Sequence, residues 1–159
     1  MDALDKLKVW CLEPLPEGRK AVKSKWVFKK KADGHFHARL VAKGFTQLEG
    51  VNFDETFSPV AHFESLRLLL ALAMLEDWEI HQMDVKLVFL HGELEEEIYM
   101  EQPIGFVTAG KEHLVCQLQK ALYGLKQASY AWNLQFHGVL TELSFMWTYS
   151  DVGVYVYHL

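Results

Sequence analysis

The sequence predicts an α+β fold in which an antiparallel sheet packs against helices. Two observations predict this fold: an alternating run around an Asp-Gly turn is typical of a β-hairpin, and a long apolar run further on suits a helix. Of the 159 residues, 50% are hydrophobic and 13% are aromatic, which is enough to bury one sizeable core. We therefore expect a single domain over residues 1–159.

A β-hairpin is predicted over residues 22–42. Lysines alternate with Trp26 and Phe28, Ala-Asp-Gly then supplies a turn, and a second alternating run follows. Because side chains alternate between the two faces of a strand, Arg39 and Lys43 fall on the same face. The hairpin is expected to present cations on that face.

The middle of the chain predicts a buried helix and then a strand. Residues 66–75 are apolar nearly all round, which is typical of a core helix, and Glu64 or Ser65 is a candidate cap. Residues 79–89 have the apolar character of a strand that ends at a His-Gly turn. Asp84 lies inside that predicted strand, where a charged side chain among apolar residues indicates a functional role.

The last third of the chain predicts two short strands, a long helix and a final strand. The two strands are expected at residues 97–101 and 115–118, where apolar and polar residues alternate. A Tyr-Gly turn then leads into a helix within residues 120–143, and residues 152–157 have the pattern of a closing strand.

Charge is distributed unevenly along the chain, although the net charge is −5. Nine of the 16 basic residues fall in one stretch: Arg19, Lys20, Lys23, Lys25, Lys29, Lys30, Lys31, Arg39 and Lys43. An acidic group follows later: Glu93, Glu95, Glu96, Glu97 and Glu101. A solvated charge run is the commoner explanation for such a stretch, and a surface for a phosphodiester ligand is the alternative.

Neither a membrane segment nor a disulfide framework is indicated. No apolar stretch approaches the roughly 20 residues needed to span a bilayer, and residues 1–20 lack the apolar core of a secretory signal. We expect an intracellular location. Cys11 and Cys116 belong to no Cys-X-X-Cys pair, so we expect reduced, buried thiols.

Five sequence blocks together resemble one family. They are K-W-V-F-K at 25–29, A-R-L-V-A-K-G-F-T-Q at 38–47, F-D-E-T-F-S-P-V at 53–60, D-V-K followed by F-L-H-G-E-L-E-E-E-I-Y-M-E-Q-P within 84–103, and L-Y-G-L-K-Q-A at 122–128. In this order, they resemble the reverse transcriptase of copia-type retrotransposons. The resemblance implies an RNA-directed DNA polymerase by descent, with the fingers (residues 10–60) and part of the palm (residues 61–159) of a right-hand polymerase.

The resemblance also implies a metal site and a sugar contact. Asp84, joined by the backbone carbonyl of Val85, matches the position that binds catalytic Mg²⁺, an ion that prefers carboxylate and phosphate oxygens. Phe89 matches the aromatic residue that packs under the sugar and rejects a ribose 2′-hydroxyl. Leu87 and Val88 depart from the family pattern, since smaller residues are usual beside the sugar.

Further matched positions imply contacts to a nucleotide and to an RNA or DNA primer–template. Arg39 and Lys43 match the fingers surface that grips a triphosphate, where charge-assisted bonds are strong. The segment that packs against the template and the nascent base pair includes Tyr123, Gly124 and Gln127. The lysines expected to contact nucleic acid are Lys25, Lys29, Lys31 and Lys126.

One expected part of the catalytic site has no match. The family's Tyr-X-Asp-Asp hairpin carries the other metal ligands, whereas this sequence contains no Asp-Asp pair and its one aspartate after Asp84 is Asp151. Two-metal chemistry needs more than one carboxylate, so we expect a truncated, inactive fragment with an open palm edge. The alternatives are a non-catalytic nucleic-acid binder and an interaction module that self-associates or captures a partner.

Overall fold

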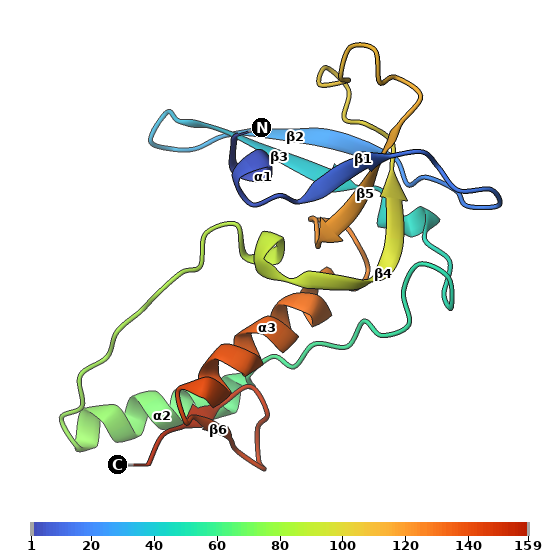
Figure 1. The fold of residues 1–159 in the computed structure, drawn as a ribbon. Coiled ribbons are helices and arrows are strands. Elements are labelled where there is room, and N and C mark those ends of the chain that lie inside the picture. Colours follow the sequence, from blue (N-terminus) through green and yellow to red (C-terminus); the bar gives the residue numbers. More distant parts are fainter. Residues whose placement is uncertain (1, 159) are drawn as a thin grey trace.

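A computed structural model describes residues 2–158 and has an α+β architecture with antiparallel sheets. Within those residues one sheet has three strands in the order β1-β5-β4, and a separate hairpin is formed by β2 and β3 (Figure 1). The strands are β1 Trp10–Glu13, β2 Ser24–Lys30, β3 Phe36–Ala42, β4 Glu93–Met100, β5 Val115–Lys120, β6 Met146–Trp147 and β7 Tyr155–Val156. The helices are α1 Asp2–Lys6, α2 Phe63–Leu75 and α3 Ala128–Glu142, with short 3-10 segments η1 Gly44–Thr46 and η2 Val88–His91.

The core lies between the three-stranded sheet and the turn before α3. Ile98, Met100 and Cys116 are fully buried on β4 and β5, and Leu122 packs with them. The N-terminal end of α3 buries Ala131 against this group. The hairpin joins the same core through Leu40 and Ala42 of β3.

The predicted hairpin is confirmed. Ser24 lies opposite Ala42 and Lys30 lies opposite Phe36, so the ladder is continuous over seven residues of each strand. In the turn, the Asp33 carboxylate accepts the backbone N–H of His35 at 3.0 Å. The alternating pattern and the Asp-Gly turn thus specify the pairing register.

The apolar helix forms as predicted, but its predicted burial is wrong. Of the thirteen residues of α2, all of them described, only Ala73 is buried, and Leu68 and Met74 are 62% and 84% exposed. Figure 1 shows α2 away from the three-stranded sheet, toward the C-terminal end of α3. Neither Glu64 nor Ser65 occupies the N-cap position, which falls at His62 and has no capping bond from its own side chain. The apolar sequence therefore forms a helix, but no other element packs closely enough to bury most of its side chains.

The predicted strand around Asp84 is also wrong. Residues 79–89, all described, contain no strand, and the segment runs as an extended coil from α2 to η2 (Figure 1). Leu87 has a φ of 57°, a left-handed conformation that interrupts an extended chain. A strand also needs a paired neighbour, whereas β4 pairs with β5. The open palm edge expected beside an Asp84 strand is therefore absent from this part of the structure.

The C-terminal elements are partly as predicted. The strands β4 and β5 and the helix α3 are confirmed, with β4 beginning four residues earlier than expected. The closing strand shrinks to the two residues of β7, paired with β6. Cys116 is buried as predicted, but Cys11 is exposed. In the part of the chain that the structure describes, no helix has the length and apolar character needed to cross a membrane.

Candidate nucleic-acid interface

The hairpin has a cationic face and an aromatic face. Residues that lie opposite each other in the ladder share a face, and Val27 lies opposite Arg39. Because side chains alternate, Lys25, Lys29 and Arg39 point to the same side. The rings of Trp26 and Phe28 lie on the other side and stack with their centroids 6.4 Å apart. The predicted cationic face is therefore present.

Three predicted site residues form a continuous row at the base of this face. The Arg39 guanidinium lies over the Tyr123 ring, 5.6 Å from its centroid. The Tyr123 ring in turn meets Phe89 edge to face, with centroids 4.8 Å apart. A cavity of about 100 Å³ beside them is lined in part by Leu87 and Leu90. The fold thus brings together Arg39, Phe89 and Tyr123, which are separated by up to 84 positions in the sequence (123 − 39).

Close backbone approach fixes the turn that carries Tyr123. The Ala42 N–H donates to the Tyr123 carbonyl at 2.7 Å, which ties the turn to the end of β3. Gly124 has a φ of 89°, and a Cβ there would collide with the Ala42 carbonyl. A Cβ on Gly44 would likewise collide with the Gly124 carbonyl. Glycine is required at both positions because the two backbones touch.

The remaining predicted cations lie at separate places on the hairpin and on the segments next to it. The Lys43 side chain is partly buried, and its backbone N–H donates to the Lys23 carbonyl at 2.7 Å. The Lys126 ammonium lies 4.4 Å from the centroid of the Phe53 ring, a cation–π contact. Lys31 is exposed at the hairpin turn.

Gln127 does not reach the interface. Only 1% of its surface is exposed, and its amide bonds to the side chain of Gln47 and to the backbone of Asn52. A buried side chain does not contact a ligand, so the predicted direct contact is not available from this conformation. Sequence reasoning missed Gln47, because a lone glutamine in a loop has no recognisable pattern.

The donor set around Asp84 does not fit a Mg²⁺ site. Asp84 is exposed on the coil, and Val85 is 46% exposed beside it. Among residues 2–158, no three His, Cys, Asp or Glu side chains come together in a way that could hold a metal ion. Mg²⁺ binds through near-ideal octahedral oxygen ligation, which one exposed carboxylate alone does not provide. The role of Asp84 as a metal ligand stays a prediction.

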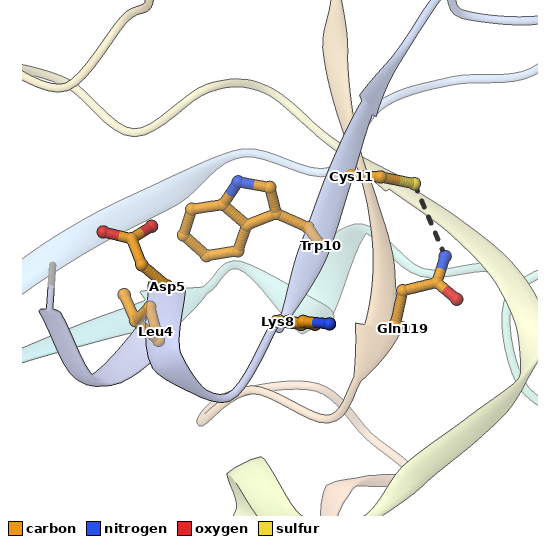
Figure 2. A pocket seen from close by; sticks show the side chains of 6 residues that line it. All are labelled: Leu4, Asp5, Lys8, Trp10, Cys11 and Gln119. Carbon is orange, nitrogen blue, oxygen red and sulfur yellow. Dashed lines mark hydrogen bonds between the residues drawn. The ribbon is translucent and has the colours of Figure 1, made fainter.

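A separate hollow of about 480 Å³ lies between α1 and the strands β1 and β5 (Figure 2). Trp10 forms one wall, and the Gln119 amide donates to the Cys11 sulfur at 3.6 Å. None of the predicted site residues lines it. The candidate interface is therefore the hairpin face and not this hollow.

The chain matches the profile of the family described as "Reverse transcriptase (RNA-dependent DNA polymerase)" over residues 7–159. This chain belongs to that reverse transcriptase family. The resemblance to copia-type retrotransposon enzymes is thereby confirmed, and the hairpin and the row beside it lie within the matched residues.

Several curated proteins are similar to this reverse transcriptase chain. It is 51% identical over 160 residues to the retrovirus-related Pol polyprotein from transposon TNT 1-94 of Nicotiana tabacum, a match covering 98% of this chain and 12% of that protein. The Pol polyproteins from transposons RE1 and RE2 of Arabidopsis thaliana are 41% and 43% identical over 153 and 148 residues, covering 92% and 90% of this chain and 10% of each relative. The chain thus spans about a tenth of the length of these relatives. No solved structure gives a significant match.

Proposed function

We propose that this chain is the nucleotide- and template-gripping part of a copia-type RNA-directed DNA polymerase and that it binds RNA or DNA primer–template through the cationic face of the hairpin. The observation that carries the proposal is the stack of Arg39 on Tyr123, with Phe89 behind it, next to the lysines of β2. In this proposal residues 10–60 act as fingers and residues 61–159 belong to the palm.

The proposed binding is electrostatic, supported by stacking. Lys25, Lys29 and Arg39 concentrate positive charge on one face of a chain whose net charge is −5. Phosphate neutralisation by such cations releases counterions, so affinity falls steeply with salt. A tyrosine ring held by a guanidinium also offers a flat surface for a base, and one such stack contributes about 1–3 kcal/mol.

The proposal is tested by fluorescence anisotropy of a labelled RNA–DNA primer–template over a series of salt concentrations. Neutralising two interface cations in an Arg39→Gln/Lys43→Gln variant should lower the slope of log affinity against log salt by about one per cation. A single-charge control is Arg67→Gln, which removes one charge on α2, away from the hairpin, and is compared with Arg39→Gln alone. Equal slopes for wild type and double variant, or no binding at low salt, would overturn the proposal.

We further propose that the isolated chain does not catalyse nucleotidyl transfer. Asp84 is exposed on a coil, and the sequence contains no Asp-Asp pair to complete a two-metal site. Primer extension with Mg²⁺ should therefore show no incorporation that depends on Asp84. Template-directed incorporation that disappears in Asp84→Asn but persists in the matched surface variant Asp54→Asn would contradict this.

Exposed apolar side chains on one side of α2 support a second proposed role in self-association. Leu68 and Leu75 are seven residues apart, so they lie on the same side of the helix, and they expose 62% and 79% of their surfaces. A second copy of the chain is the occupant we propose. Size-exclusion chromatography at several concentrations should show concentration-dependent dimers that a Leu68→Glu/Leu75→Glu variant abolishes, and a concentration-independent monomer would contradict this role.

A further inference from the structure

Two glutamine side chains, 80 positions apart in the sequence, meet in the interior behind the candidate interface. Gln47 is 4% exposed and Gln127 is 1% exposed. The Gln47 Nε2 donates to the Gln127 Oε1 at 3.0 Å. Buried amides without partners are costly, so a buried pair that bonds to itself indicates a specific structural task.

The other ends of both amides bond to backbone. The Gln47 Oε1 accepts the Lys126 N–H at 2.8 Å, and the Gln127 Nε2 donates to the Asn52 carbonyl at 2.7 Å. The Gln47 Nε2 also approaches that carbonyl at 3.4 Å. These bonds join the loop that follows β3 to the turn that precedes α3.

The joined segments carry the interface groups. On the loop, Phe53 is buried and its ring lies under the Lys126 ammonium. On the turn, Tyr123 lies under the Arg39 guanidinium. The close contact between the Gly44 and Gly124 backbones lies between the same two segments, and we call this contact region the seam. A small shift of the turn would therefore move Tyr123 and Lys126 relative to Arg39.

We propose that the Gln47–Gln127 pair is a positioning latch that fixes the turn at residues 123–127 against the end of β3, so that Tyr123, Lys126 and Arg39 face one polyanionic ligand. This inference rests on the proposed function. It makes Gln127 a positioning residue and not a ligand contact. The latch acts through the Lys126 backbone and the Asn52 carbonyl.

Changing one amide to a carboxyl group gives a variant whose defect depends on pH. In Gln127→Glu the ionised carboxylate still accepts from Gln47 but has no hydrogen to donate to the Asn52 carbonyl. The protonated carboxyl group has one O–H and restores that bond. Burial raises the pKa of a carboxyl group, which brings the protonated form into an accessible pH range.

The first readout is the affinity for a labelled single-stranded RNA oligonucleotide at about pH 8 and about pH 5. Relative to wild type at the same pH, Gln127→Glu should bind RNA at least about fivefold more weakly at the higher pH, because the ionised carboxylate cannot make the buried bond to the Asn52 carbonyl. At the lower pH the affinity should be within about twofold of wild type, because the protonated carboxyl group restores that bond. The control Gln135→Glu adds the same charge at an exposed position of α3. The latch would be overturned if the ratio of variant to wild-type affinity were the same at both pH values. It would also be overturned if Gln135→Glu showed the same change in this ratio with pH as Gln127→Glu.

The second readout needs no ligand. The hydrogen-exchange protection factor of the Lys126 N–H should fall in Gln127→Glu at the higher pH and recover at the lower pH. If wild type binds no RNA but this protection changes as expected, the proposed function fails and the latch stands as a structural device. If wild type binds RNA and the protection stays constant, the latch fails alone.

A third variant covers the case in which Gln127→Glu does not fold. Gln47→Met removes the pair without adding charge, so weak Lys126 protection and weak binding should appear at both pH values. Circular dichroism identifies folded samples. A folded Gln47→Met variant with wild-type protection and wild-type affinity would overturn the proposal.

Discussion

The Asp151 carboxylate accepts the backbone N–H of His62 at 2.7 Å, across 89 positions of sequence. Its other oxygen accepts the Gly153 N–H at 2.9 Å, and the side chain is buried. A hydrogen bond from the Ser65 side chain and the bond from His62 lower the pKa of Asp151 below its ordinary value. Asp151 therefore satisfies, from the other end of the chain, the backbone N–H of the N-cap residue of α2, and we call this contact the Asp151 cap.

This cap makes the attachment of α2 sensitive to acid. Because the folded-state pKa of Asp151 is lowered, its stabilisation is complete above the ordinary carboxyl pKa and is lost as the pH falls through the folded-state pKa. We expect the hydrogen-exchange protection of the His62 N–H to drop in wild type as the pH falls below the ordinary carboxyl pKa. Asp151→Asn should be less protected at neutral pH and lack that drop; an identical pH profile in both proteins would refute the cap.

The seam between Gly44 and Gly124 should tolerate no methyl group. Gly124 and Gly34 have similar φ values of 89° and 85°, but a Cβ on Gly34 meets open space. Gly34→Ala should therefore cost about 1 kcal/mol of unfolding free energy, which is the left-handed backbone penalty alone. Gly124→Ala should cost at least about 2 kcal/mol more through overpacking. Urea unfolding measures both, and equal losses would contradict the close approach.

The edge-to-face pair of Phe89 and Tyr123 should contribute to stability as well as to the interface. Phe89 is half-buried, so Phe89→Ala should lower the unfolding free energy by about 2 kcal/mol, less than at a fully buried site. Phe89→Leu keeps much of the apolar contact but loses the ring, and about half of that loss is expected. Thermal and urea unfolding of the two variants would measure the difference. Two equal, negligible losses would show that the ring pair is not stabilising.

The two cysteines should react very differently. Burial, with a smaller effect of Cys11, raises the pKa of Cys116 to about 12. The thiolate is the reactive form, so a thiol reagent at about pH 8 should modify Cys11 and leave Cys116 until the protein unfolds. Cys11→Ser should then show no fast-reacting thiol in the native state. A fast reaction in that variant would place Cys116 at the surface.

The sequence pattern predicted the hairpin because the residues that determine its turn and its strand pairing are close together in the sequence. Lysines and aromatic residues alternate, and Asp33 with Gly34 closes the turn, so the register follows from a few neighbouring residues. The resemblance to reverse transcriptases also predicted that Arg39, Phe89 and Tyr123 belong to one site, and these residues do lie together.

Longer-range features could not be predicted from the pattern. The apolar run of α2 shows a preference for an apolar environment, but burial depends on which elements pack there, and Ala73 alone is buried among its described residues. The left-handed Leu87 ended an expected strand, although leucine gives no warning of that conformation. Gln47 and Asp151 act through partners about 80 to 90 positions away, which no local window contains.

The two-sided hairpin makes the length of its strands more critical than the identity of any single lysine. A substitution on β2 or β3 changes one side chain, whereas the insertion or deletion of one residue within Phe36–Ala42 turns every following side chain to the opposite side. Leu40 and Ala42 would then leave the interior, and Arg39 would point into it. Among diverging copies of such a sequence, single-residue length changes in this hairpin should be the earliest lesions to abolish folding, while lysine substitutions accumulate with the fold intact.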